Sequence, residues 1–264
     1  MRSVFTCLLV IGLFGCIASN TLAQAPTASD EKALAVIAKS VTQLGGERYL
    51  KVTSQVGKGN FSSLRDGGVI SYQSFLDAIV FPDKERTEFK GSGSQTIQVN
   101  TGDTGWIFDG DQQLIKIQTP VQIENFKRGI RTSLDNLLRG YWKGQAAVSY
   151  VARRQGGLGR RNDVIKLTYN DGFAIEFEFT DDGMPVKAVY KHKNLADEDI
   201  KDEDRYAQFV DVDGVKVPFI IDRFMDGEPV SRINYESIDL NKRIPDSAFI
   251  KPASVKDAKK SVNY

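Results

Sequence analysis

Apolar residues recur at helical spacing in two long stretches of this chain and alternate with polar residues nearly everywhere else. The first helical stretch covers residues 30–44. Residues 29–31 supply a capping side chain and acids at the positive end of the helix dipole, and the glycine pair 45–46 ends the helix. We expect one more short helical turn over residues 47–51. The apolar stripe of the long helix consists of Leu34, Ile37, Ala38, Val41 and Leu44.

The second helical stretch covers residues 121–140, where apolar residues are spaced three and four apart. Gly140 limits its end. Two amphipathic helices stay soluble only if their apolar stripes are covered, so we expect a sheet that wraps both. The stripe of this second helix consists of Ile123, Phe126, Ile130, Leu134, Leu137, Leu138 and Tyr141.

Most other segments alternate with a period of two and are bounded by turn residues, which indicates β-strands. In residues 173–179 four large apolar side chains share one face, as in a half-buried strand. These are Phe173, Ile175, Phe177 and Phe179. We expect strands at residues 52–61, 69–81, 85–89, 94–100, 105–109, 114–118, 146–153, 163–169, 173–179 and 184–191.

The strongest sheet signal lies in residues 209–252, and the first of its strands begins at Tyr206. The dipeptides 213–214 and 226–227 are both Asp-Gly, which favours two-residue hairpin turns. They separate three long strands, the last two at residues 215–225 and 230–240, and three such strands in a row imply a meander. We expect Val217, Phe219 and Ile221 to face inward and Phe249 to pin the chain end against this wall.

Turns arrive every eight to twelve residues and no proline- or serine-rich linker interrupts them, so we predict one domain over residues 26–252 and a polar tail over 253–264. The predicted fold class is α+β, with a single large curved antiparallel sheet of about ten or eleven strands and helices on its concave face. A sheet of this size must curl, because strands twist.

Residues 1–25 have the pattern of a secretory signal peptide: a positive start, an apolar middle and small residues before the cleavage site. The alternative is a lipoprotein signal in which Cys16 is acylated, although the bulky Phe14 disfavours it. Both cysteines lie in this segment, so we expect no disulfide and no thiol chemistry in the mature protein. No other apolar run approaches the roughly 20 residues that span a bilayer.

The charge balance excludes nucleic acid as the main partner. Lys plus Arg number 35 against 34 Asp plus Glu, and removal of the signal peptide takes away Arg2 and makes the two sets equal. Nucleic-acid-binding domains carry a clear basic excess.

Residues 155–161 are glycine-rich and include two arginines. A phosphate-binding loop follows a strand, precedes a helix and closes with Lys-Ser or Lys-Thr. Here a strand follows and the closing pair is missing. A flexible hairpin is therefore the favoured interpretation.

Residues 194–204 are dense in carboxylates, but their spacing fits no calcium loop. We expect a solvated acidic loop, which would repel acidic partners or meet a basic one. His192 is the only histidine, and without cysteine partners it assembles no zinc site. Since it stands between two lysines, we expect it to be solvent-exposed. We predict no catalytic residues, no metal and no cofactor.

Four sequence features together resemble one known family. They are the helix end Leu44-Gly45-Gly46, residues 100–106 (NTGDTGW), residues 217–219 (VPF) with 227–230 (GEPV), and residues 240–252 (LNKRIPDSAFIKP). The chain looks like the outer-membrane lipoprotein-sorting proteins of the LolA/LolB-like lipoprotein carrier superfamily. The resemblance implies a half-open β-barrel with helices over its concave face and a cavity for the acyl chains of lipids or lipoproteins.

The function that we predict is a non-catalytic periplasmic carrier or binder of such acyl chains, and not an enzyme. The alternative is an envelope-stress sensor or protein-binding regulatory module on the same scaffold, with an envelope protein as its partner. The candidate cavity-lining residues are Leu34, Ile37, Val41, Phe126, Ile130, Leu134, Leu137, Phe173, Ile175, Phe177, Phe179, Val217, Phe219 and Ile221.

Overall fold

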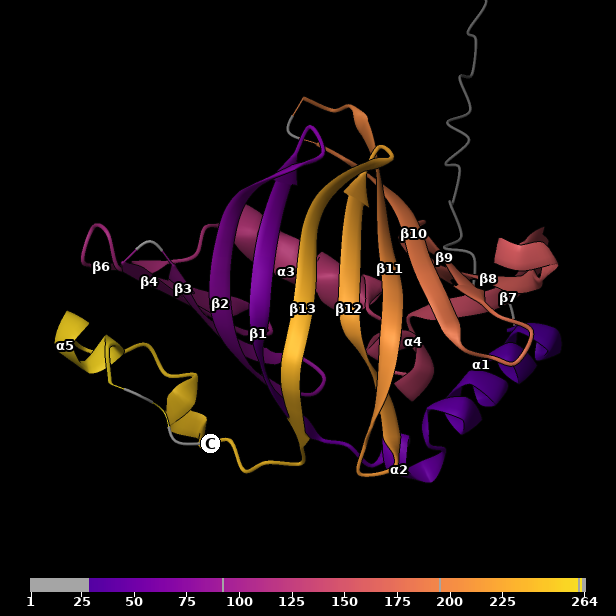
Figure 1. Ribbon diagram of the computed structural model, residues 1–264, viewed down its shortest axis with the longest axis horizontal. Helices are drawn as coiled ribbons and strands as arrows, with labels where there is room; N and C mark the ends of the chain where they lie inside the picture. The colour runs from indigo at the N-terminus through magenta and orange to yellow at the C-terminus, as the bar shows by residue number, and fades with distance from the viewer. Residues whose placement is uncertain (1–28, 92, 195, 261, 263–264) are drawn as a thin grey trace, which may run out of the picture.

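The structure is a computed structural model that describes residues 29–91, 93–194, 196–260 and 262. The expected signal peptide with Cys16 lies outside the described residues. The described chain forms one sheet of thirteen antiparallel strands, drawn in Figure 1. These are β1 (Ser54–Arg65), β2 (Gly68–Val80), β3 (Lys84–Gly91), β4 (Ser94–Thr101), β5 (Thr104–Asp109), β6 (Leu114–Ile117), β7 (Ala146–Gln155), β8 (Arg161–Tyr169), β9 (Ala174–Phe179), β10 (Pro185–Lys193), β11 (Asp199–Val212), β12 (Val215–Met225) and β13 (Glu228–Leu240).

The strand order is β6-β5-β4-β3-β2-β1-β13-β12-β11-β10-β9-β8-β7. Every neighbour follows in sequence except β1 and β13, which join the first meander to the second. Strands β6 and β7 form the two edges, so the sheet is curved but not closed. The chain between β6 and β7 must therefore cross from one edge to the other, and it does so as helices behind the central strands.

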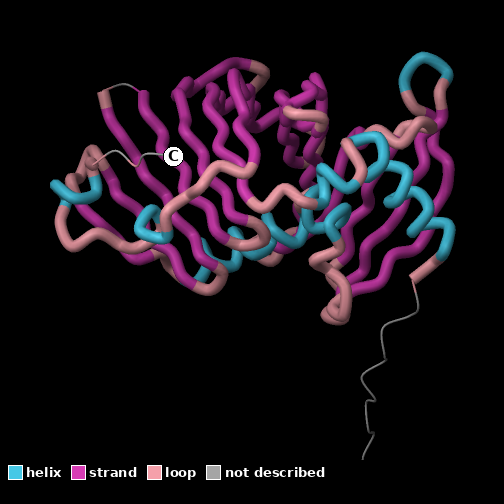
Figure 2. The backbone as a smooth tube through the Cα atoms, turned by 90° about the horizontal axis from the view of Figure 1, so that it is seen from below, coloured by secondary structure: helices cyan, strands magenta, loops and turns pink. Residues whose placement is uncertain are grey.

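The helices lie along the inner side of the curved sheet, as Figure 2 shows. Helix α1 begins at the side-chain cap of Asp30, and the Asp30 backbone N–H also bonds to Val148 O on β7 at 2.9 Å. Helix α3 begins with a capping box made by Thr119 and Gln122. The helices and 3-10 turns are α1 (Glu31–Leu44), α2 (Glu47–Leu50), α3 (Pro120–Thr132), α4 (Leu134–Arg139), η1 (Gly157–Gly159), η2 (Asp246–Ala248) and α5 (Val255–Ala258).

The expected single helix over residues 121–140 is wrong, because it breaks at Ser133. This residue has φ −68° and ψ 148°, an extended conformation that ends α3. Its hydroxyl then accepts a hydrogen bond from Asn136 N at 3.1 Å and caps α4. The break exposes backbone N–H groups at the start of α4. Serine is a favoured N-cap residue, and its hydroxyl satisfies one of these groups. The break lets the chain change direction beneath the sheet.

The strand count also differs from the expected ten or eleven. Each alternating segment forms its own paired strand, and even the short segment β6 makes a register of four residues with β5. The acidic segment 194–204 is not a loop throughout, since β11 begins at Asp199 and pairs with β10 from there. Glycine-rich residues 155–161 form a hairpin between β7 and β8, as expected.

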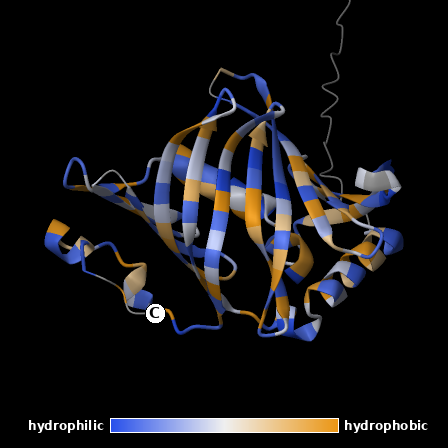
Figure 3. Ribbon diagram, in the orientation of Figure 1, coloured by the Kyte–Doolittle hydropathy of each residue, from blue (hydrophilic) through white to orange (hydrophobic). Residues whose placement is uncertain are grey.

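Both Asp-Gly hairpins form as the sequence predicts. Asp213 and Gly214 have φ of 54° and 80°, and Asp226 and Gly227 have 50° and 92°. Positive φ at both central residues is the type I′ geometry that suits the strand twist. Gly45 ends α1 against the first of these turns, where an added Cβ would lie 2.5 Å from the carbonyl oxygen of Gly214. Both hydrophobic and hydrophilic residues occur along the central strands β12 and β13 (Figure 3).

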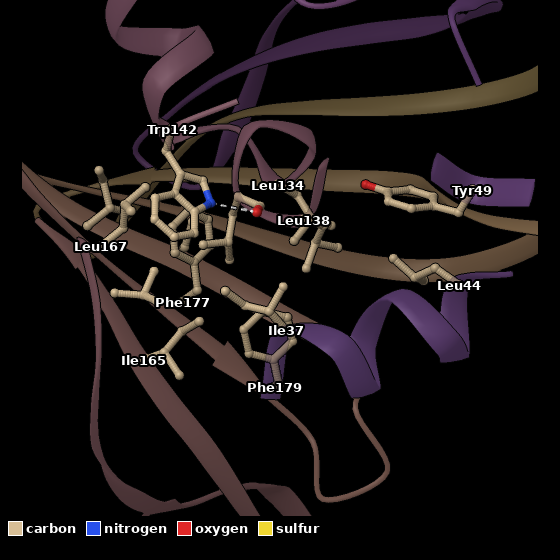
Figure 4. Packing of buried hydrophobic residues seen from close by; sticks show 14 of the residues in the cluster. Ile37, Leu44, Tyr49, Leu134, Leu138, Trp142, Ile165, Leu167, Phe177 and Phe179 are labelled. Atoms are coloured by element: carbon tan, nitrogen blue, oxygen red, sulfur yellow. Dashed lines mark hydrogen bonds between the residues drawn. The ribbon is translucent and has the colours of Figure 1, made fainter. Parts of the chain in front are cut away.

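The main hydrophobic core lies between helices α1 and α4 and strands β7 to β10. Phe177 and Phe179 are fully buried there, beneath Ile37 of α1 and Leu138 of α4 (Figure 4). Trp142 closes this core, and its indole N–H donates to the carbonyl oxygen of Leu137 at 2.9 Å. The core therefore belongs to the second half of the chain and to the helices that precede it.

A second, smaller core anchors the C-terminal segment to the first half of the sheet. Phe249 packs on β4 and β5, and its carbonyl oxygen accepts a hydrogen bond from Trp106 Nε1 at 3.0 Å. Arg86 donates to Ala248 O at 3.1 Å and forms a buried pair with Glu88 at 2.8 Å. Phe249 thus holds the chain end against β4 and β5, and not against the strands of residues 206–240 as expected. Ala258 of α5, in the segment predicted as a polar tail, is buried in the same cluster.

Candidate functional site

A cavity of about 590 Å³ lies between helices α3 and α4 and the concave face of the sheet. Its walls come from strands near the junction of the two meanders, mainly β11, β12 and β13. Helix α3 crosses this face, as Figure 1 shows, and supplies the opposite wall. This volume is in the range of small-molecule sites in proteins.

Apolar side chains supply much of the cavity wall. Phe126 and Ile130 come from α3, and Leu134 comes from the start of α4. The same face of β12 contributes Val217 and Ile221, because residues two apart on a strand share a face. Other apolar lining residues are Leu44, Val52, Ile79, Phe81, Pro82, Val215, Pro218, Phe224, Met225, Val230, Ile233, Ile238 and Leu240.

The structure brings five of the candidate lining residues together at this cavity and places the other nine elsewhere. Leu34, at 38% exposure, lies on the outer side of α1, and Val41 packs partly buried against the main core. Helix α1 packs on β7 and β8, so only its last residue, Leu44, reaches the cavity. The remaining seven belong to the main core or lie against it: Ile37, Leu137, Phe173, Ile175, Phe177, Phe179 and Phe219.

Polar side chains also line the cavity, and the sequence analysis missed them. Asp77 lies two residues before Ile79, and Arg223 lies two residues after Ile221, so both share a face with apolar lining residues. The sequence could have indicated them by spacing: each charged residue lies two positions from an apolar residue that faces inward on the same strand. The polar lining residues on the strands include Asp77, Glu85, Tyr190, Asp202, Asp204, Tyr206, Arg223 and Tyr235, and those on the helices include Arg128, Asp135 and Arg139.

Asp77 of β2 and Glu85 of β3 share one hydroxyl donor. Thr87 Oγ1 lies 3.0 Å from Asp77 Oδ1 and 3.2 Å from Glu85 Oε1. Burial raises the pKa of Asp77 well above its ordinary value, and the neighbouring carboxylate of Glu85 raises it further. Burial likewise raises the pKa of Glu85. The cavity wall therefore holds a carboxyl pair that binds protons more readily than free carboxyls do.

We expect Asp77→Asn to increase the free energy of unfolding at pH 7. A raised folded-state pKa means that this carboxyl favours folding below its unfolded pKa, near 3.8, and that this stability is lost as pH rises through the folded pKa. Asparagine resembles the protonated form and does not ionise. Urea unfolding between pH 4 and pH 8 should show the stability advantage of the variant growing with pH.

The control for this experiment is Asp111→Asn in the exposed turn between β5 and β6. This variant should change the free energy of unfolding by less than about 0.5 kcal/mol, because the Asp111 side chain is exposed. If Asp77→Asn destabilises the protein equally at every pH, burial does not raise the pKa of Asp77.

The acidic segment takes part in this site through β11. Asp202 and Asp204 point inward and Glu203 points to the convex face, because strand residues alternate. His192 of β10 pairs with β11 and is not solvent-exposed: 17% of its side chain is accessible. Its Nδ1 lies 3.0 Å from Asp202 Oδ2, although the angles are not those of a hydrogen bond. The expected solvent exposure of His192 is therefore wrong. Pairing with β11 buries its side chain, and the flanking lysines gave no indication of this contact.

Within residues 29–260, leaving out 92 and 195, no three His, Cys, Asp or Glu side chains are placed to hold a metal ion. In the same part of the chain, no helix has the length and apolar character needed to cross a membrane. The cavity is thus an apolar space crossed by a band of charged and hydroxyl groups, which we call the polar band. Such a space suits an amphiphile, with an apolar portion against the walls and a polar portion on the band.

Comparisons with known proteins support the fold. No family model matches the sequence, and no curated protein matches it. Among solved structures, a LolA superfamily protein from Nitrosomonas europaea has a TM-score of 0.56 at 14% identity, and the match covers 83% of this chain and 97% of that one. A DUF1329 family protein from Desulfovibrio piger has a TM-score of 0.59 at 12% identity, with the same two coverages.

A third solved structure points to the same architecture. It is a putative outer membrane lipoprotein-sorting protein domain from Vibrio parahaemolyticus, with a TM-score of 0.54 at 9% identity. The match covers 83% of this chain and 96% of that one. At such low identities these likenesses establish a LolA-like fold.

Proposed function

We propose that this protein, which has a LolA-like fold, binds the acyl chains of lipids or lipoproteins in the cavity beneath α3. It would do so in the periplasm as a carrier and would catalyse no reaction. The observation that carries the proposal is the apolar cavity between the helices and the sheet, lined by Phe126, Ile130 and Ile221. The lipoprotein-sorting domain among its structural neighbours supports the same role.

Burial of an acyl chain supplies enough free energy for binding without any catalytic group. Each methylene group removed from water contributes about 0.8 kcal/mol. The cavity walls offer aromatic and aliphatic partners from helix α3 on one side and from β12 and β13 on the other. A chain held there leaves only when a better acceptor takes it, because affinity alone produces no directed transfer.

We expect the affinity for saturated fatty acids to rise about fourfold for each added methylene group until the cavity is full. The measurement is displacement of a fluorescent fatty acid from the purified protein by competitors of increasing chain length. A plateau would mark the chain length that fills the cavity.

Two outcomes would count against this proposal. Affinity that does not depend on chain length would show that the apolar walls do not hold the ligand. Mass spectrometry of protein from its native envelope that finds no lipid, but a stoichiometric protein partner, would favour the protein-binding alternative.

A further inference from the structure

Arg223 is a cation placed inside the cavity, on the same face of β12 as Ile221. Its Nε lies 3.5 Å from Asp204 Oδ1 on the neighbouring strand β11. Half of the Arg223 side chain is accessible, and Arg223 is one of the residues that line the cavity. A charged pair in such a place is costly in free energy unless further partners satisfy it.

The pair between Arg223 and Asp204 is incomplete. A guanidinium group has five N–H donors, and in the described part of the chain Arg223 makes no hydrogen bond that meets ordinary geometry. The adjacent position on the convex face behaves differently. There Asp222 accepts two hydrogen bonds from Arg232, at 2.5 and 2.8 Å. Strand β12 takes part in both pairs: with β13 it forms a tight bidentate pair on the convex face, and with β11 it forms a loose pair on the concave face. The inner groups, which line the cavity, therefore keep hydrogen-bonding capacity for a ligand.

A further carboxyl group stands beside this inner pair, because Asp202 lies on the same face of β11 as Asp204. Two other guanidinium groups line the cavity, but each already has a partner. That of Arg128 donates to Asn125 at 2.9 Å, and that of Arg139 donates to Asp135 at 2.8 Å. The remaining lining cations are Lys84 and Lys216. A ligand with only a negative head group would pair with Arg223 and leave Asp204 without its cation. A ligand that also carries an ammonium group satisfies both.

We propose that the inner pair of Arg223 and Asp204 binds the zwitterionic head group of a phospholipid. The phosphate accepts hydrogen bonds from the Arg223 guanidinium, and the ammonium donates to Asp204 and the carboxylates beside it. The acyl chains then lie along the apolar walls at Ile221 and Ile233. This inference rests on the proposed function and adds the class of lipid that the cavity selects.

The test compares two short-chain lipids that differ only in their heads, dihexanoyl phosphatidylethanolamine and dihexanoyl phosphatidylglycerol. Each lipid is added as a competitor to the full-length protein with a fluorescent fatty acid bound, and the displacement of the fatty acid gives the affinity of the lipid. We expect the wild-type protein to bind the ethanolamine lipid about tenfold more tightly, as a charge-assisted hydrogen bond would give. The double variant Arg223→Gln/Asp204→Asn should bind the two lipids equally, since it removes both charges and leaves neither unpaired.

The matched control is Arg232→Gln/Asp222→Asn, which neutralises the tight pair that β12 forms with β13 on the opposite face of the sheet. It should keep the tenfold preference. Equal binding of both lipids by the wild-type protein would overturn the inference, and so would a preference that survives in the inner double variant or is lost in the outer one. Binding of the fluorescent fatty acid itself reports separately on the proposed function.

Discussion

Replacement of Phe177 by alanine should lower the free energy of unfolding by about 3–5 kcal/mol. The Phe177 side chain is fully buried in the main core, beneath α1 and α4, and alanine would leave a cavity there (Figure 4). Domains of ordinary stability unfold with about 5–15 kcal/mol, so this loss is a large fraction of the total. Urea denaturation followed by tryptophan fluorescence measures it, and Trp142 in the same core is the reporter.

The matched control is Tyr72→Ala on β2, where the aromatic side chain is 62% exposed. Its effect should stay within about 0.5 kcal/mol, because an exposed side chain away from any cap or ion pair contributes little. If the two substitutions destabilise the protein equally, Phe177 is not buried between the helices and the sheet.

Replacement of Ile221 by tryptophan should weaken acyl-chain binding roughly 50-fold while the protein stays folded. Ile221 lines the cavity from β12, opposite the side chains of α3. An indole ring there fills space that about three methylene groups would occupy, and each contributes about 0.8 kcal/mol. Displacement of a fluorescent fatty acid measures the affinity, and circular dichroism verifies the fold.

The control is Ile220→Trp, which adds the same ring to the opposite face of β12. Acyl-chain affinity should be unchanged in this variant. Unchanged affinity in Ile221→Trp as well would place the bound chain outside the cavity.

The polar band would lower the affinity of the cavity for an acyl chain. Asp77, Glu85 and Arg223 interrupt the apolar walls, so a bound chain gains less than it would in a uniformly apolar cavity. Moderate affinity helps release, because a carrier that binds too tightly retains its cargo. Under the proposed function, the charged groups would therefore serve both selection of the head group and transfer of the lipid.

Local sequence signals determined the turns and most of the strands. The two Asp-Gly pairs predicted hairpins, and both adopt the positive φ values that glycine and aspartate accept more readily than other residues. The alternation in residues 173–179 placed Ile175, Phe177 and Phe179 on one face, and all three are fully buried. These features depend on residues close in sequence, so they were open to prediction.

The acidic segment shows where local signals end. A run of carboxylates indicates a solvated loop, but Asp199 to Asp204 form a strand because β10 pairs with all of them and β12 pairs with Asp202 to Asp204 on the other side. Alternation then sends Asp204 inward and Glu203 outward. Tertiary pairing outweighs the low strand propensity of aspartate, since each backbone group gains a partner in the ladder.

Only the tertiary structure decided which apolar faces line the cavity. A period of two tells which residues share a face, but it does not tell what that face meets. Phe177 meets α1 and α4 and is core, while Ile221, equally inward, meets open space beneath α3. The difference arises from the long-range pairing of β1 with β13 and from the break at Ser133, which together direct the helices across the sheet. Contacts between residues so far apart depend on the curvature of the whole sheet, and no short stretch of sequence contains that information.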